Sequence, residues 1–140
     1  MDLLNATDVR KNWSVTLDSV VRERPAYIKR TRDNLALLNM DTLSYVLEGY
    51  KYSAEIFIEK DGSVTLSADY LDLVVNAKDE EQAKKALASD IKEYAEDYYE
   101  NYAVWSVAPN RKSHIPYVLK ALALNENQIA EELVCRNGKN

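Results

Sequence analysis

The stretch NATDVRKNWSVTLDSVVRERPAYIKRTRDNLALLNMDTLSY, residues Asn5–Tyr45, decides the fold of the N-terminal part of this chain. It begins with Asn5, a favoured helix N-cap, and its first half ends at Pro25, which a helix interior does not tolerate. Apolar residues recur between them at helical spacing, and they predict one amphipathic helix with a single apolar stripe: Val9, Trp13, Leu17, Val20 and Val21.

A β-hairpin is predicted after this helix. Ala26–Arg30 and Leu35–Met40 have the composition of short strands, and Asp33-Asn34 between them is typical of a tight turn. Asp41 is the expected N-cap of a second helix, whose apolar face comprises Leu43, Val46 and Leu47. Residues 1–50 are therefore predicted to form a helix–hairpin–helix module.

The rest of the chain, residues 51–140, is predicted to form a second domain. Its expected strands are 54–60, 63–68, 71–77 and 104–107, with Asp61-Gly62 as the turn between the first two. Its expected helices are a long one from Asp79 to about Asn101 and two C-terminal ones, 113–124 and 125–135. The predicted fold class is α+β: the N-terminal module, then a small antiparallel sheet with one long helix and C-terminal helices.

Charge is distributed unevenly along the chain, whose net charge is −5. Residues 1–50 are neutral overall, residues 51–108 carry −7 and residues 109–140 carry +2. A net negative chain is not expected to bind nucleic acid over its whole surface, so any such binding would be confined to a local basic patch. The acidic middle segment would have to point away from nucleic acid.

Composition narrows the class of protein. The single cysteine, Cys135, excludes an internal disulfide and a cysteine-based zinc site. No apolar run approaches the roughly 20 residues that a membrane-spanning helix needs, and the N-terminus lacks the order of a signal peptide. We expect a cytoplasmic protein that does not contact a membrane and that needs no cofactor or metal.

Basic residues in the first 50 positions are the first candidates for function. Arg10 and Lys11 are expected in the first turns of a helix, where free backbone N–H groups also favour a phosphate. Arg30 and Arg32 lie two residues apart near the hairpin tip, a spacing that places side chains on the same side of a strand. The same residues could equally be ordinary solvated charges, which are common on protein surfaces.

Four short motifs in this region occur in a recognisable order: Val9-Arg10-Lys11-Asn12-Trp13, Tyr27-Ile28-Lys29-Arg30, Ala36-Leu37-Leu38-Asn39-Met40 and Asp41-Thr42-Leu43-Ser44-Tyr45. In these motifs, residues 1 to about 50 resemble the N-terminal module of Phd/YefM-type antitoxins, which are dimeric DNA-binding proteins of toxin–antitoxin operons. The acidic second domain resembles the HicB-type antitoxin domain more weakly, in the order of its elements only.

The resemblance implies an antitoxin of a type II system that is not an enzyme. It would bind operator DNA as a homodimer, repress its own operon and neutralise a toxin by direct binding. Arg10 would contact DNA from the helix and Arg30 from the hairpin, with Lys11, Asn12 and Arg32 in support. Trp13 and the apolar stripe would be core residues.

The place of toxin binding is a separate expectation. Typical Phd/YefM members end in a short segment that folds onto the toxin, whereas about 90 further residues of this chain look folded. The apolar spacing and terminal position of the last two helices favour them as the toxin contact: Ile115, Val118, Leu119, Leu122, Ile129 and Leu133. The alternative is the acidic face of the long helix, with Glu93, Glu96, Asp97 and Glu100.

Two other function classes remain open at this point. The chain could be a dimeric protein-interaction module that does not bind DNA. The second class is an enzyme, but the sequence shows no candidate catalytic site. His114 is the only histidine and has no nucleophile at a meaningful spacing. Cys135 is expected to be a packed thiol. We therefore expect no catalytic residue.

Overall fold

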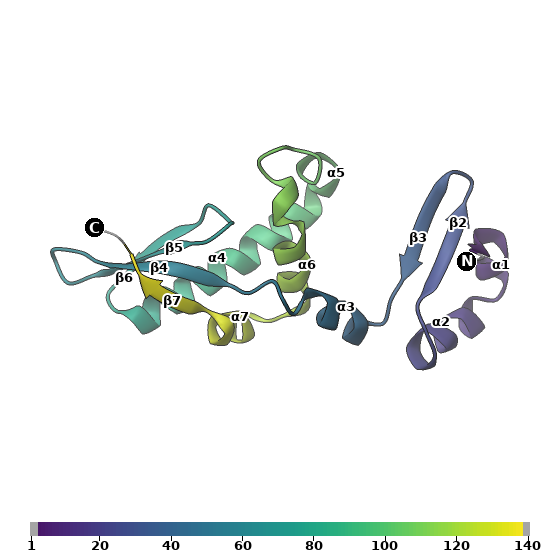
Figure 1. Cartoon of the computed structure of the whole chain (residues 1–140), viewed down its shortest axis with the longest axis horizontal. Helices are drawn as coiled ribbons and strands as arrows, with labels where there is room; N and C mark the ends of the chain where they lie inside the picture. The colour runs from purple at the N-terminus through teal and green to yellow at the C-terminus, as the bar shows by residue number, and fades with distance from the viewer. Residues whose placement is uncertain (1–2, 139–140) are drawn as a thin grey trace. The chain divides into compact units, whose positions relative to one another are not determined.

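The computed structural model describes residues 3–138. The chain divides into two compact units, one ending at Val46 and the other beginning at Leu47 (Figure 1). Each unit contains its own β-sheet with helices, so the predicted α+β class is confirmed. No helix of the described part is both long and apolar enough to cross a membrane.

The first unit is built on a three-stranded sheet in the order β1-β2-β3. The two-residue strand β1 pairs in parallel with β2, and β2 pairs with β3 as an antiparallel hairpin. Its elements are β1 (Leu4–Asn5), α1 (Ala6–Lys11), α2 (Trp13–Arg22), β2 (Ala26–Arg30) and β3 (Asp33–Leu37), followed by α3 (Met40–Leu47) at the junction with the second unit.

Asn12 breaks the predicted single helix into α1 and α2. Its side-chain amide donates to the Asp8 carbonyl at 3.0 Å, and the Thr16 hydroxyl donates to the Asn12 carbonyl at 3.1 Å. Short polar side chains that bond to nearby backbone groups compete with helix continuation, which explains the break. Arg10 and Lys11 therefore lie in the last turn of α1, and the prediction that they stand at a helix start is wrong.

The predicted apolar stripe is also divided. Val9 and Val20 are buried, whereas Trp13, Leu17 and Val21 are exposed in the single chain. The expectation that Trp13 lies in the core therefore fails within one copy of the chain.

The hairpin turn lies two residues earlier in the chain than predicted. β2 has the predicted bounds, but the turn consists of Thr31 and Arg32, and Arg30 pairs with Asp33 across it. Thr31 adopts φ 54°, a left-handed backbone conformation that is uncommon for a β-branched residue. Arg32 thus lies in the turn rather than on the same strand face as Arg30.

The next helix also begins differently from the prediction. The Asn39 side chain accepts from the Asp41 N–H at 2.8 Å, so Asn39 takes the capping role expected of Asp41.

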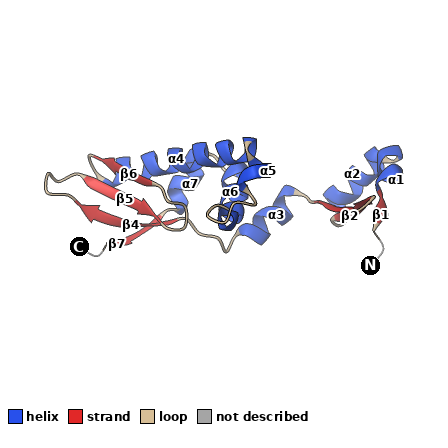
Figure 2. Cartoon of the chain, turned by 90° about the horizontal axis from the view of Figure 1, so that it is seen from above, coloured by secondary structure: helices blue, strands red, loops and turns tan. Residues whose placement is uncertain are grey.

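The second unit contains a four-stranded sheet in the order β6-β5-β4-β7. The long helix α4 covers one face of this sheet, with α6 and α7 packed against the helix (Figure 2). The elements are β4 (Ser53–Ile58), β5 (Val64–Ala68), β6 (Val74–Ala77), α4 (Glu80–Glu100), α5 (Tyr102–Trp105), the 3₁₀ turn η1 (Lys112–His114), α6 (Ile115–Ala123), α7 (Glu126–Glu132) and β7 (Val134–Asn137).

Local signals in the second unit are confirmed. The Asp61 carboxylate accepts from the Ser63 N–H at 2.9 Å, and Gly62 has φ 87°, as a tight hairpin turn requires. Asp79 caps α4 by accepting from the Gln82 N–H at 2.8 Å. Asn125 and Gln128 form a reciprocal capping box at the start of α7.

The fourth strand is not where the sequence predicts it. Residues 104–107 belong to the short helix α5 and the turn after it, and the fourth strand is β7 at the C-terminal end. β7 pairs in parallel with β4, from Ser53 with Val134 to Ile56 with Asn137, so the sheet is mixed. Arg136 ties the two strands together because its guanidinium donates to both Asp69 and Glu55.

The core of the second unit lies between α4 and the sheet. Among its fully buried side chains are Leu66 from β5, Leu87 and Tyr98 from α4, Val118 from α6 and Ile129 from α7. The tyrosines of α4 separate by face, since Tyr98 is buried and Tyr99 is exposed. Tyr94 and Tyr102 are half-buried against the same core as Tyr98.

Candidate functional site

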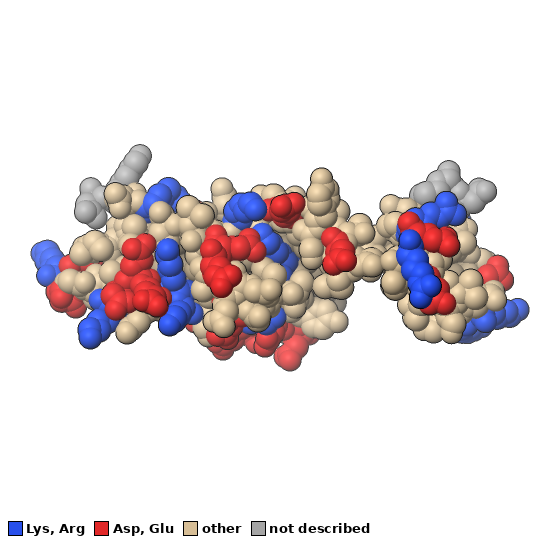
Figure 3. All heavy atoms as spheres, turned by 90° about the horizontal axis from the view of Figure 1, so that it is seen from below, with Lys and Arg blue, Asp and Glu red and all other residues tan. Residues whose placement is uncertain are grey.

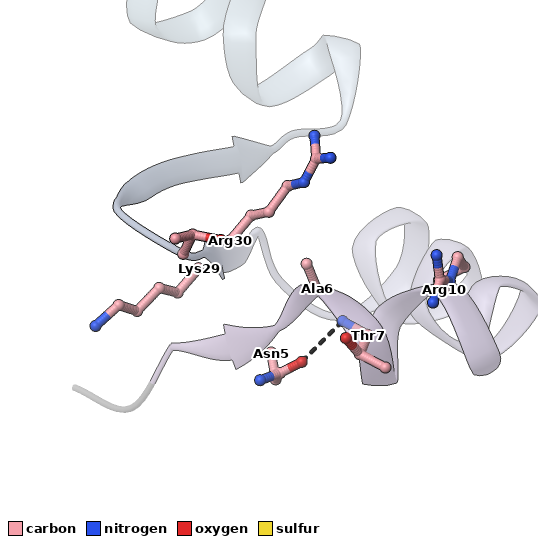
Figure 4. Close-up of a pocket in the computed structure, with 7 residues that line it drawn as sticks. Asn5, Ala6, Thr7, Arg10, Lys29 and Arg30 are labelled. Carbon is pink, nitrogen blue, oxygen red and sulfur yellow. Dashed lines mark hydrogen bonds between the residues drawn. The ribbon is translucent and has the colours of Figure 1, made fainter.

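A basic concavity lies where β1 leads into α1, beside the end of β2 (Figure 4). The parallel pairing of Asn5 with Lys29 brings these two parts of the chain together. We call this concavity the basic pocket; its lining residues are Asn5, Ala6, Thr7, Arg10, Lys29, Arg30 and Thr31. The Asn5 side chain accepts from the Thr7 N–H at 2.8 Å and fixes the entry to α1.

Three cations line this pocket from two elements. Arg30 extends from its strand to the side on which Arg10 lies, while Lys29 extends the opposite way (Figure 4). All three side chains are exposed, and none of them forms an ion pair with an acidic residue of the described part of the chain. Guanidinium groups that line one concavity without a carboxylate partner are suited to binding an external anion such as a phosphate.

The structure brings together some of the predicted DNA-binding residues and separates others. Arg10 and Arg30 share the basic pocket, whereas Lys11, Asn12 and Arg32 do not line it. The Asn12 amide is engaged in ending α1. Lys29 was not among the predicted site residues, and only the pairing of the two-residue strand β1 reveals its place.

An apolar groove on the first unit is the second feature of interest. It is lined by Leu4, Val15, Thr16, Ser19, Arg24, Pro25, Ala26 and Tyr27. The first unit buries few hydrophobic side chains, namely Val9, Val20 and Ala26, and exposes many large ones. The exposed set includes Leu4, Trp13, Val15, Leu17, Val21, Tyr27 and Leu35.

The helices predicted to contact a toxin face inward. Val118, Ile129 and Leu133 are buried core residues, and Ile115 and Leu122 are half-buried against the same core; Leu119 is also half-buried. Their apolar spacing is explained by the packing of α6 and α7 on α4. These side chains pack on the core of the second unit and form no free apolar surface among the described residues, and their role as the toxin contact stays a prediction.

His114 and Cys135 occupy packed positions. His114 Nδ1 lies 2.7 Å from the Tyr94 hydroxyl, and burial lowers the pKa of the imidazole below its ordinary value. Cys135 is half-buried in β7, and burial raises the pKa of its thiol. A neutral, hydrogen-bonded histidine and a protonated thiol both have the character of structural groups.

Comparisons with known proteins agree with this architecture. Residues 1–135 match the PHD-like family model, described as antitoxin of toxin–antitoxin, RelE/RelB, TA system. The chain is also similar to a solved structure from Syntrophomonas wolfei subsp. wolfei, described as "an antitoxin part of a putative toxin/antitoxin system". That similarity has a TM-score of 0.92 and 35% sequence identity, and it covers 99% of this chain and 100% of the other. A comparison with curated proteins gave no match.

Because the family model spans nearly the whole chain and the similar structure shares both units, the family assignment does not rest on the N-terminal motifs alone. This chain belongs to the PHD-like family of antitoxins of toxin–antitoxin systems.

Proposed function

We propose that this antitoxin binds operator DNA as a homodimer of the Phd/YefM type, represses its own operon and neutralises its toxin by direct binding. It acts without catalytic residues, cofactor or metal, in the cytoplasm. The observation that carries the DNA-binding part is the basic pocket, which Arg10 and Arg30 line from two elements without an acidic partner among the described residues.

The difference in net charge between the two units supports DNA binding through the first unit. The first unit, up to Val46, holds seven Lys and Arg residues against six Asp and Glu residues, whereas the second holds 11 against 17. Basic side chains are visible on the smaller unit in Figure 3. DNA would be repelled by the second unit, so phosphate contacts belong to the first.

Residue roles follow from the pocket. Arg10 and Arg30 are the proposed principal phosphate contacts, and Lys29 is added to them because it lines the same concavity. Lys11, Asn12 and Arg32 remain proposed supporting contacts outside the pocket. Arg32 is exposed in the hairpin turn, so its side chain could contact DNA that lies past the end of the hairpin.

Fluorescence anisotropy with DNA from the chain's own promoter tests this proposal. Each lost phosphate contact lowers the log–log salt slope by about 0.9, so Arg10→Ala/Arg30→Ala should lower it by about 3 to 4 in a dimer. The matched control is Lys51→Ala/Lys60→Ala, which removes the same charge from exposed sites of the second unit. An equal loss of affinity in both variants, or no promoter binding by a folded dimer, contradicts DNA binding through this pocket.

Dimerisation is proposed from the small core of the first unit. The first unit has fewer than 50 residues, and three of its described hydrophobic residues are buried, so its core alone contributes little stability. Units of this size usually need disulfides, a bound metal or association with a second copy. The apolar groove with Leu4, Val15 and Tyr27 is the proposed contact. Val15→Glu should convert the dimer to a monomer in analytical ultracentrifugation, since Val15 is exposed in the single chain. A dimer that persists in this variant contradicts the assignment.

A further inference from the structure

Three large apolar side chains are exposed within nine residues of the second unit, around the corner between α4 and α5. Tyr99, Val104 and Val107 have exposed fractions of 66%, 68% and 73%. Single exposed apolar residues need no explanation, whereas exposed apolar side chains that gather beside charged residues are typical of a protein-binding surface, and these three lie close together in the sequence. We call this group, with its acidic neighbours Glu96, Asp97 and Glu100, the α4–α5 corner.

An aromatic cluster beneath it holds the corner rigid. Trp105 of α5 stacks on Tyr94 with ring centroids 6.0 Å apart and meets Tyr98 edge-on at 5.7 Å. The Arg111 guanidinium lies 3.8 Å from the centroid of the Trp105 ring, and the Tyr98 hydroxyl donates to the Arg111 carbonyl at 2.9 Å. Because Trp105 fills the inner side, Val104 and Val107 are presented outward at little further cost in conformational entropy.

The charges at the corner are uncompensated. Glu93, Glu96, Asp97 and Glu100 are exposed, and no ion pair among the described residues involves any of them. The last turn of α4 contains no basic residue, so its carboxylates stand at the negative end of the helix dipole, which disfavours them. Acidic side chains are visible at several places on the second unit, among basic ones (Figure 3).

The nearest basic residue on the helix does not relieve this charge. Lys92 is the only Lys or Arg between residues 86 and 110. Its Nζ donates to the carbonyls of Ala121 at 3.0 Å and Leu124 at 2.7 Å, at the end of α6. Carboxylates at the C-terminal end of a helix with no cation beside them disfavour folding. Such an arrangement points to a partner protein that supplies the missing positive charge.

We propose that the α4–α5 corner is the docking surface for the toxin and that it contacts a basic face of that protein. Tyr99, Val104 and Val107 enter an apolar depression on the toxin, and Glu96, Asp97 and Glu100 pair with Lys or Arg around it. This inference rests on the proposed neutralisation by direct binding and replaces the α6–α7 residues as the contact. A basic partner is favoured over a second copy of the chain because the same net negative unit would repel itself here.

Binding of the full-length chain to the product of the reading frame adjacent to its gene tests the inference, by calorimetry and stopped-flow association. Tyr99→Ala/Val104→Ala should weaken the Kd about tenfold or more, as truncation of central anchors does. The matched control is Val74→Ala, an equally exposed valine on β6, which should leave the Kd unchanged. Thermal melting of each variant checks folding, which these exposed positions should preserve.

A second pair of variants tests the charge. Glu96→Gln/Glu100→Gln should slow association severalfold at low salt and flatten its salt dependence. Glu126→Gln/Glu131→Gln, at two exposed acidic positions of α7, should not.

The outcomes separate the two levels of the proposal. If the wild-type chain binds the adjacent gene product and all four variants bind it with the same Kd, the α4–α5 corner is not the docking surface, but neutralisation by direct binding still stands. If Tyr99→Ala/Val104→Ala weakens binding but Glu96→Gln/Glu100→Gln leaves association and its salt dependence unchanged, the contacted face of the toxin is not basic. No binding of the adjacent gene product by the wild-type chain overturns neutralisation, and with it this inference.

Discussion

Replacing Glu132 by alanine should destabilise the second unit more than removing its partner Lys120. The Lys120 ammonium donates to Glu132 Oε1 at 2.6 Å and to the Tyr50 carbonyl at 3.0 Å, and it lies 5.4 Å from the Tyr52 ring centroid. The Lys120 side chain is 10% exposed and that of Glu132 is 31% exposed. The two groups therefore differ in how far water can replace a lost partner.

The magnitudes follow from this difference. Breaking a buried pair by removing one partner costs about 3–5 kcal/mol of unfolding free energy because a charge is left buried. After Glu132→Ala the ammonium stays buried but keeps one carbonyl, so we expect about 2–3 kcal/mol. After Lys120→Met the carboxylate rehydrates and the methionine fills most of the space, so we expect about 1 kcal/mol. The double variant should be more stable than Glu132→Ala alone.

Urea denaturation followed by tryptophan fluorescence measures these differences. The chain has two tryptophans, one in each unit, and a Trp13→Phe background leaves Trp105 to report on the second unit alone. The slope of unfolding free energy against urea should be unchanged among the variants. If Lys120→Met costs as much as Glu132→Ala, or if the two effects simply add, the argument from unequal burial is refuted.

Three further predictions concern the second unit. Leu87→Ala should cost about 2–5 kcal/mol of unfolding free energy in urea titrations, because Leu87 is fully buried, whereas Val104→Ala should stay within about 0.5 kcal/mol. Gly138→Ala should cost about 1–3 kcal/mol in the same titrations, since a Cβ there would lie 2.2 Å from the Phe57 ring; an unchanged midpoint would contradict this contact. Burial lowers the pKa of His114, so its stabilising contribution is full above the unfolded value of about 6.5 and is lost as pH falls below it. Unfolding free energy should therefore drop between pH 7 and 5 by at most about 1.4 kcal/mol per pH unit, and less in His114→Gln.

Features with short-range causes could be predicted from the sequence. The caps at Asp79 and Asn125 and the turn at Asp61-Gly62 each depend on hydrogen bonds that span no more than three residues. The hairpin turn lies two residues earlier than predicted, at Thr31-Arg32, although Asp33-Asn34 has the more usual turn composition. That choice is determined by the cross-strand pairing, which the local composition does not specify.

The candidate site was only partly predictable for the same reason. Arg10 and Arg30 stand out as basic residues in matching motifs, but Lys29 joins them through the pairing of β1 with β2. Helical spacing identified Val118 and Ile129 as apolar face residues, yet it does not distinguish a face that meets the core from one that meets a partner. The exposed side of α4 became visible only once Tyr98 and Tyr99 were assigned to opposite faces.

The parallel pairing of β7 with β4 has a consequence for how the chain folds as it is made. Ser53 of β4 pairs with Val134, which follows it by 81 residues, so the outer edge of β4 stays open until residues 134–137 have left the ribosome. Contacts this distant in sequence carry a large loop-closure cost and slow folding. The nascent antitoxin therefore passes through a stage in which the edge of β4 is unpaired and the Phe57 ring is not yet covered by Gly138. Both are then accessible to proteases and to other chains. The sheet of the second unit can therefore be completed only after β7 has been translated.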